Sequence, residues 1–120
     1  MAAINFNQKF IDAVLSGDKP CTTRKTKRCK VGDTIQIYTG QRTKNCQKHG
    51  EATCTGIGRI LISKNGAWYF YTIDGETFTE RDGKPFYQLE GFANHMCMVD
   101  FFKDHYGLPF EGYVHYFKLN

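Results

Sequence analysis

The sequence has 120 residues, with 16 Lys or Arg against 12 Asp or Glu and a net charge of +4. A chain of this length is expected to form a single domain, residues 1–120, whose core needs neither disulfides nor metal. No apolar run approaches the roughly 20 residues of a bilayer span, and the N-terminus lacks the basic flank and apolar stretch of a signal peptide. We therefore expect a cytoplasmic protein with no membrane partner.

The first elements predicted along the chain are an edge strand and a helix. Residues 4–6 alternate apolar and polar, and Asn7 is suited to cap a helix over residues 8–16. Gly17 ends the apolar helical pattern, because glycine adopts the left-handed conformation that closes helices. The helix residues expected to face the core are Phe10 and Val14, with Ala13 and Leu15 as further candidates.

A short strand is predicted directly after Pro20. Alternation in this strand places Thr22 and Arg24 on one face and Cys21 and Thr23 on the other. The face with Thr22 and Arg24 is the more polar one, and we expect it to line the functional site.

The middle of the chain predicts two further strands separated by a polar stretch. The basic run 25–30 has no apolar periodicity and predicts a surface loop, whereas residues 34–38 alternate as a half-buried strand. Residues 39–51 are polar and predict a long loop or a distorted hairpin. Residues 52–62 return to strand composition. Two glycines are expected to bend this strand, Gly56 and Gly58.

The last part of the chain predicts a hairpin, a helix and a final strand. Residues 68–73 and 76–80 flank Asp74-Gly75, a sequence typical of tight hairpin turns. Residues 88–106 have helical spacing, and residues 111–119 alternate again. The apolar stripe of the helix is expected to comprise Phe92, Met96, Val99 and Phe101 or Phe102. The mixture of strands and helices predicts an α+β fold.

The five cysteines make an odd number without the regular spacing of a secreted disulfide scaffold, so reduced thiols are expected. Cys46-x-x-His49, with Cys29 and Cys54, offers three thiolates and an imidazole as zinc ligands. This set lacks a paired Cys-x-x-Cys. We therefore favour ordinary thiols and expect no metal and no other cofactor.

Two stretches resemble landmarks of the ASCH domain family. The first comprises Gly17, Lys19, Thr22, Arg24 and Val31-Gly32-Asp33, and the second is Leu89-Glu90-Gly91-Phe92. The resemblance implies a small PUA-like mixed β-barrel with two packed helices, and an association with RNA. One bacterial branch of the family is an acetylcytidine amidohydrolase that uses a Lys, a Thr and a Glu, which would correspond to Lys19, Thr22 and Glu90. Pro20 stands where that branch has a second threonine.

Two functions follow from this resemblance. In the first, the domain binds RNA or a modified nucleoside in a cleft lined by Lys19, Thr22, Arg24 and Glu90. In the second, it is an amidohydrolase that deacylates an acetylated cytidine-like nucleoside. Neutral Lys19 would then take the proton of Thr22, and Glu90 would face Lys19 across the cleft. Arg24 and backbone N–H groups near Gly91 would stabilise the oxyanion.

Further residues are candidates for contact with nucleic acid. An aromatic ring could stack on a base, as expected of Trp68, although strand aromatics also fill ordinary cores. The cations could equally serve only to keep the surface solvated. The candidate phosphate-binding residues are Arg24, Lys27, Arg28 and Arg42. The expected partner is RNA or a modified nucleoside, and the protein is expected to be a monomer.

Overall fold

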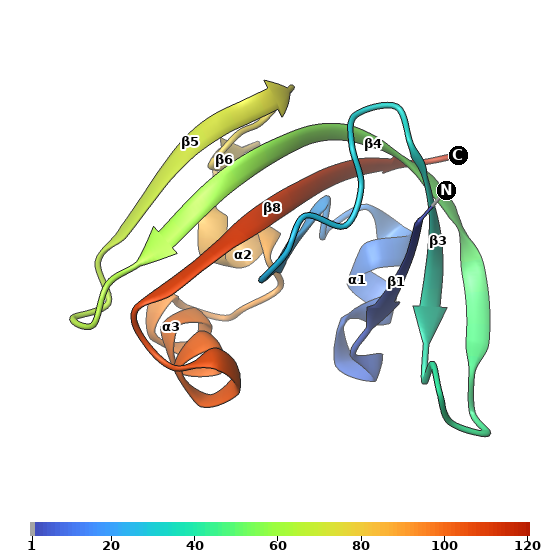
Figure 1. Ribbon diagram of the computed structural model, residues 1–120, viewed down its shortest axis with the longest axis horizontal. Coiled ribbons are helices and arrows are strands. Elements are labelled where there is room, and N and C mark those ends of the chain that lie inside the picture. Colours follow the sequence, from blue (N-terminus) through green and yellow to red (C-terminus); the bar gives the residue numbers. More distant parts are fainter. Residues whose placement is uncertain (1) are drawn as a thin grey trace.

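The computed structural model describes residues 2–120 (Figure 1). Its strands are β1 (Ala2–Phe6), β2 (Cys21–Arg24), β3 (Thr34–Thr39), β4 (Gln47–Ile62), β5 (Trp68–Gly75), β6 (Glu80–Arg81), β7 (Lys84–Pro85) and β8 (Phe110–Leu119). Its helices are the 3-10 turn η1 (Gln8–Phe10), α1 (Ile11–Ser16), α2 (Phe86–Leu89) and α3 (His95–Tyr106). The longest of these helices, α3, has 12 residues, and none in the described part of the chain has the length and apolarity needed to cross a membrane.

Six strands form one mixed sheet, in the order β1-β3-β4-β8-β2, with β5 pairing along the far half of β4. β1 is parallel to β3, and the other neighbours in this sheet are antiparallel. The sheet curves into a half-barrel, and its long strands β4 and β8 arch over the helices (Figure 1). The expected α+β class is therefore confirmed.

The curved sheet has a hydrophobic core on each face. One face packs against α2 and α3 and includes Ile60, Ile62, Val114 and Tyr116. The other face packs against β1 and α1 and includes Phe117. The predicted alternation of the last strand is thus correct, because its odd and even positions enter different cores.

The bend in β4 coincides with its glycines, as expected. The pairing register shifts between Cys54 and Gly56 and again between Ile57 and Gly58. A Cβ on Gly56 would lie 1.8 Å from the carbonyl oxygen of Glu76, so no larger residue fits there. β4 also begins earlier than residue 52, because residues 47–51 pair with β3. The distorted hairpin, rather than the long loop, is the structure of this region.

The predicted hairpin around Asp74-Gly75 is wrong. Residues 68–75 pair with β4 instead, and the turn between these strands is at Asn65-Gly66, where Ser63 and Ala67 are hydrogen bonded at 2.8 Å. The sixteen residues of β4 give β5 a long partner, which a short segment such as residues 76–80 cannot match. A small second hairpin forms at Asp82-Gly83, where β6 and β7 pair.

The predicted helix over residues 88–106 is interrupted. Gly91 adopts a φ of +97°, which ends α2, and Asn94 caps α3 by accepting a hydrogen bond from the N–H of Cys97. Residues 2–120 therefore contain three short α-helices rather than the two helices that were predicted. The apolar stripe changes with this boundary. Met96 is 62% exposed, and the buried residues of α3 are Met98, Val99 and Phe102.

The N-terminal prediction holds more closely. Asn7 caps the first helical turn by accepting from the N–H of Lys9, and Phe10 and Val14 are buried. Leu15 was wrongly expected to face the core, because it is 40% exposed, and Ile11 is buried in this helix instead. Gly17 ends α1 with a φ of +87°. The chain then turns into β2, which is the edge strand beside β8.

Candidate functional site

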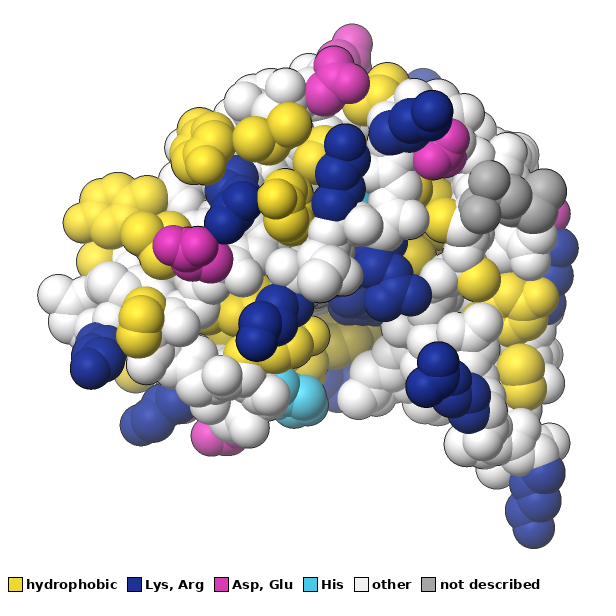
Figure 2. Space-filling view, in the orientation of Figure 1, with side chains coloured by type: hydrophobic (Ala, Val, Ile, Leu, Met, Phe, Trp, Pro, Cys, Tyr) yellow, Lys and Arg dark blue, Asp and Glu magenta, His cyan; other side chains and the backbone are white. Residues whose placement is uncertain are grey.

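A cleft of about 320 Å³ opens between the β1 and β2 edges of the half-barrel and α3. Figure 2 shows a hollow on this face, with hydrophobic side chains in its depth and Lys or Arg side chains around it. The lining residues are Asn5, Phe6, Asn7, Phe10, Lys19, Thr22, Thr23, Arg24, Glu90, Phe92, Phe101, Phe102, His105 and Tyr106. The cleft thus brings together four predicted site residues, Lys19, Thr22, Arg24 and Glu90.

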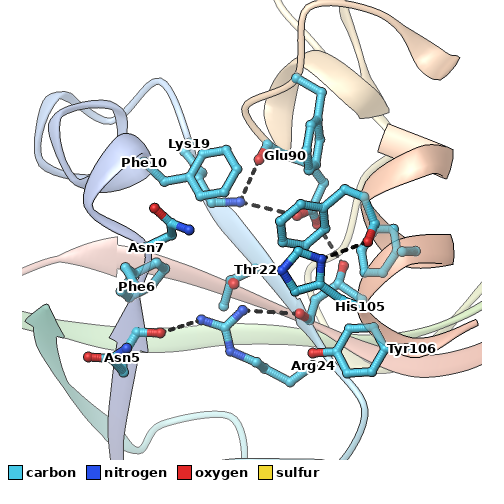
Figure 3. A pocket seen from close by; sticks show the side chains of 14 residues that line it. Asn5, Phe6, Asn7, Phe10, Lys19, Thr22, Arg24, Glu90, His105 and Tyr106 are labelled. Carbon is cyan, nitrogen blue, oxygen red and sulfur yellow. Dashed lines mark hydrogen bonds and ion pairs between the residues drawn. The ribbon is translucent and has the colours of Figure 1, made fainter. Parts of the chain in front are cut away.

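An ion pair between Lys19 and Glu90 lies at the base of the cleft (Figure 3). Lys19 Nζ is 3.1 Å from Glu90 Oε2 and 2.6 Å from the carbonyl oxygen of Glu90. The two side chains are only 4% and 3% exposed. Glu90 therefore faces Lys19 within hydrogen-bond distance, as expected. Two charges buried this far are tolerated because each has a partner.

The other carboxylate oxygen of Glu90 is held by β2. The hydroxyl of Thr23 donates to Glu90 Oε1 at 2.7 Å, and the thiol of Cys21 lies 3.6 Å from the same oxygen. Burial and the neighbouring Glu90 carboxylate raise the pKa of the Cys21 thiol well above its usual range. Cys21 is therefore a neutral donor at this position. Lys19 and Thr23 together fix the orientation of the carboxylate.

Thr22 and Arg24 share the other face of β2. Thr22 is only 1% exposed and lines the cleft. In residues 2–120 no group hydrogen bonds to its hydroxyl, so this hydroxyl is open for a hydrogen bond to a ligand in the cleft. Arg24 donates to the carbonyl oxygen of Asn5 at 2.8 Å and to that of Thr23 at 3.2 Å. Its guanidinium therefore bridges the two open edges of the half-barrel (Figure 3).

Aromatic rings form the wall of the cleft opposite β2. Phe101 packs against Phe92 at a centroid distance of 5.3 Å, and the ring of His105 stacks on Phe101 at 4.0 Å. Tyr106 continues this wall along α3. Lys9 Nζ lies 5.7 Å from the ring centroid of Phe92, 5.6 Å from that of Phe101 and 4.8 Å from that of Phe10, so a cation borders the aromatic wall. The cleft is polar at its base and aromatic at its side.

A buried histidine supports the site strand from behind. His115 Nε2 accepts from the backbone N–H of Arg28 at 2.9 Å, so Nδ1 carries the hydrogen and donates to the carbonyl oxygen of Thr22 at 3.2 Å. Burial, together with the charges of Arg24 and Arg28, lowers the pKa of His115 to about 4. A neutral imidazole thus joins Thr22 to the basic loop.

Four predicted nucleic-acid residues lie outside the cleft. Lys27 and Arg28 are exposed in the loop after β2, and Arg42 is exposed in the turn between β3 and β4 with a φ of +66°. Trp68 stacks on Phe86 at 5.1 Å, against the core beside α2. These four side chains therefore do not line the cleft that contains Lys19.

Sequence reasoning missed the aromatic wall and the role of Thr23. The pairs Phe101 with His105 and Phe102 with Tyr106 are four residues apart, a spacing that puts them on one helix face, and this was the available signal. Nothing in the sequence indicates that Thr23 meets Glu90, because that contact depends on how α2 packs against β2.

The prediction that backbone N–H groups near Gly91 are free to stabilise an oxyanion is wrong. The N–H groups of Glu90, Gly91 and Phe92 donate to the carbonyl oxygens of Phe86, Gln88 and Tyr87. These N–H groups already have hydrogen-bond partners because α2 ends at this point in tight turns. The prediction had assumed that a helix begins here, which would have left its first N–H groups free. Of the expected oxyanion donors, the Arg24 side chain and the backbone N–H groups near Gly91, Arg24 remains.

All five cysteines are free thiols. Within residues 2–120, no group of three or more His, Cys, Asp or Glu side chains is arranged to hold a metal ion. Cys46 is exposed, whereas Cys29 and Cys54 are buried in the core beneath β1.

Comparison of this chain with family models, with curated proteins and with solved structures finds no match.

Proposed function

We propose that this protein is an ASCH-type domain of PUA-like architecture that binds RNA or a modified nucleoside in the cleft. The observation that carries the proposal is the buried Lys19–Glu90 pair at the base of an aromatic-walled cleft. These two residues, with Thr22 and Arg24, are also the ones that resemble the family's pattern. Their convergence from segments 71 residues apart in sequence supports the resemblance.

The chemistry of the cleft suits a nucleobase. A planar base can stack on rings such as Phe101 and Tyr106, while its polar edge meets hydrogen-bonding groups. The hydroxyl of Thr22 is open for such a bond. The volume of about 320 Å³ lies at the small end of the range for ligand pockets, which favours one nucleoside over a longer segment.

The alternative proposal is deacylation of an acetylated cytidine-like nucleoside. The specific observation in its favour is the open Thr22 hydroxyl in the same cleft as a buried lysine and glutamate. Against it, Lys19 Nζ donates to two oxygens of Glu90, and within residues 2–120 no hydrogen bond joins Nζ to the Thr22 hydroxyl, whose proton it would have to take. Binding without hydrolysis is therefore our first proposal.

Calorimetric titration of the purified protein with cytidine, N4-acetylcytidine and ribose tests both functions. We expect saturable binding of a nucleoside and none of ribose. Replacing Thr22 by Val should weaken nucleoside binding about 10-fold, because one hydrogen bond to the ligand is lost. Valine has the shape of threonine, so this variant should fold normally.

The matched control is Thr26→Val, since Thr26 is an exposed threonine of the loop outside the cleft. Release of acetate from N4-acetylcytidine, lost in Thr22→Val, would establish the hydrolase instead. Absence of binding to every nucleoside would refute the proposed function. We avoid Lys19 and Glu90 in this test, because removing one member of a buried pair typically costs about 3–5 kcal/mol of stability.

A further inference from the structure

A row of alternating cationic and aromatic side chains crosses the sheet from the cleft. Arg24 on β2 is opposite Tyr113 on β8, Tyr113 is opposite Arg59 on β4, and Arg59 is opposite Tyr71 on β5. Residues opposite each other in antiparallel strands share a face, so these four side chains lie side by side. Three strand spacings of about 4.8 Å give the row a length of about 14 Å.

The two central members of the row are in direct contact. The guanidinium of Arg59 lies 4.7 Å from the ring centroid of Tyr113 and donates to the Tyr113 hydroxyl at 2.9 Å. Arg24, at the inner end, lines the cleft. The strand register therefore extends the row from the cleft to β5.

The outer end of the row is open to solvent. Tyr71 is 57% exposed, and Tyr69, two residues away on the same face of β5, is 62% exposed. Ile73, where the pairing of β5 with β4 is irregular, is 46% exposed. Figure 2 shows hydrophobic side chains gathered over the region of β5, with Lys or Arg side chains beside them. Such a group of exposed aromatic rings is unusual on a surface that meets only water.

The basic loop runs along the same face. Arg28 is bonded to His115 on β8, Gly32 donates to the carbonyl oxygen of Cys54 on β4, and a Cβ on Gly75 of β5 would touch Val31. The loop thus crosses from β8 to β5 beside the row (Figure 1). Its exposed cations are Lys25, Lys27, Arg28 and Lys30.

We propose that the row Arg24–Tyr113–Arg59–Tyr71 is a binding path for single-stranded nucleic acid, on which bases stack while the basic loop contacts phosphates. Exposed rings beside cations are what a flexible strand needs, because stacking accepts any base and the cations neutralise the backbone. This inference rests on the proposed function, in that the cleft at the inner end would take one nucleoside of the strand.

Glu111 limits the charge of this path. Its carboxylate accepts from Arg59 at 2.9 Å and is 63% exposed, so it orients the guanidinium but also competes with phosphate. Removing this carboxylate should therefore strengthen binding, which an apolar docking surface would not do.

Fluorescence anisotropy with fluorescein-labelled octauridylate and octadeoxythymidylate, at 50 and 200 mM salt, tests the path. Eight nucleotides lie within the roughly 4–16 that small single-strand-binding folds cover. Tyr71→Ala should weaken binding about 10-fold, and Arg59→Ala by a similar factor. Glu111→Gln should strengthen it about 2- to 5-fold. The matched control Tyr71→Phe keeps the ring and should bind within 2-fold of the wild type.

Cytidine titration of the same Tyr71→Ala protein separates this inference from the proposed function, because Tyr71 is outside the cleft and cytidine affinity should not change. If Tyr71→Ala binds both oligonucleotides as tightly as the wild type, the proposed path is wrong, whereas the proposal that the cleft binds a nucleoside still stands. Equal affinity for a duplex would overturn it as well, since paired bases cannot stack on the rings. Sedimentation that reveals a dimer dissociated by Tyr71→Ala would assign the rings to self-association instead.

Discussion

At the scale of single residues, His115 makes the site strand sensitive to acid. The native pKa of about 4 lies below the ordinary value of 6.5, so the unfolded state binds more protons between these pH values. The stability that neutral His115 supplies is complete above pH 6.5 and is lost as the pH falls toward 4. We expect a loss of about 3 kcal/mol over this range.

Urea unfolding at several pH values measures this loss, and His115→Gln is the comparison because glutamine does not titrate. The variant should be less stable at pH 7.5, since its amide cannot reproduce both bonds to Arg28 and Thr22. Its stability should also fall less between pH 6.5 and 4. Parallel pH curves for the two proteins would mean that the pKa of His115 is the same in the folded and unfolded states.

The residues of the cleft show how far the sequence predicts a site. Lys19 and Thr22 could be chosen because a short turn and strand alternation place them locally, and the family pattern added Glu90. What the sequence did not predict was which hydroxyl meets that glutamate. Thr23, not Thr22, donates to Glu90, because the contact is decided by the packing of α2 on β2 rather than by any local rule.

At the scale of elements, the short link between α2 and α3 positions Glu90. A Cβ on Gly91 would lie 2.9 Å from the ring of Phe10, and the φ of +97° already disfavours any side chain. We expect Gly91→Ala to lower the free energy of unfolding by about 2–3 kcal/mol, through backbone strain and this clash together. It should also weaken nucleoside binding, because Phe10 lines the cleft and Glu90 precedes the glycine.

Gly83→Ala is the matched control for this prediction, measured by the same chemical unfolding. Gly83 has a similar φ of +77°, but no atom would lie within 4 Å of an added Cβ. Gly83→Ala should lower the free energy of unfolding by about 1 kcal/mol and should leave nucleoside binding unchanged. Equal losses in the two variants would mean that the contact with Phe10 is accommodated and that only the backbone conformation matters.

The positions of the strands along the sequence were predicted better than the pairing between strands. Alternation located the β3 and β8 segments to within one residue, because each has one face in a core. The turn sequences gave the wrong hairpin where two candidate turns lie close together in the sequence. Asp74-Gly75 and Asn65-Gly66 are both typical hairpin turns, and the choice between them follows from the length of β4, which pairs with both β5 and β8.

At the scale of the whole molecule, the curvature of the sheet explains why the site was only partly visible in the sequence. The half-barrel brings the edge strands β1 and β2 near each other, where Arg24 bonds to Asn5, and the cleft forms beside this gap. Strand alternation specifies a face of a sheet, but closure depends on bulges and packing along its whole width. The aromatic wall on α3 belongs to this global arrangement.

The two cores of the molecule also decide the reactivity of its five cysteines. Cys46 and Cys97 are exposed, whereas Cys21, Cys29 and Cys54 are buried. The neighbouring Cys54 thiol and burial raise the pKa of Cys29, and the neighbouring Cys29 thiol lowers the pKa of Cys54. Because attack requires both a thiolate and access, the buried thiols should be slow to react in the native protein.

We therefore expect an aromatic disulfide reagent to titrate two thiols rapidly in the native protein and all five after unfolding in guanidinium without reductant. Cys46→Ser should lower both counts by one, which identifies a fast thiol and serves as the internal control. Three thiols after unfolding would instead indicate a disulfide, for which the neighbours Cys29 and Cys54 are the pair in contact. Five rapid thiols in the native protein would show that the cores open on the time scale of the reaction, against the burial described above.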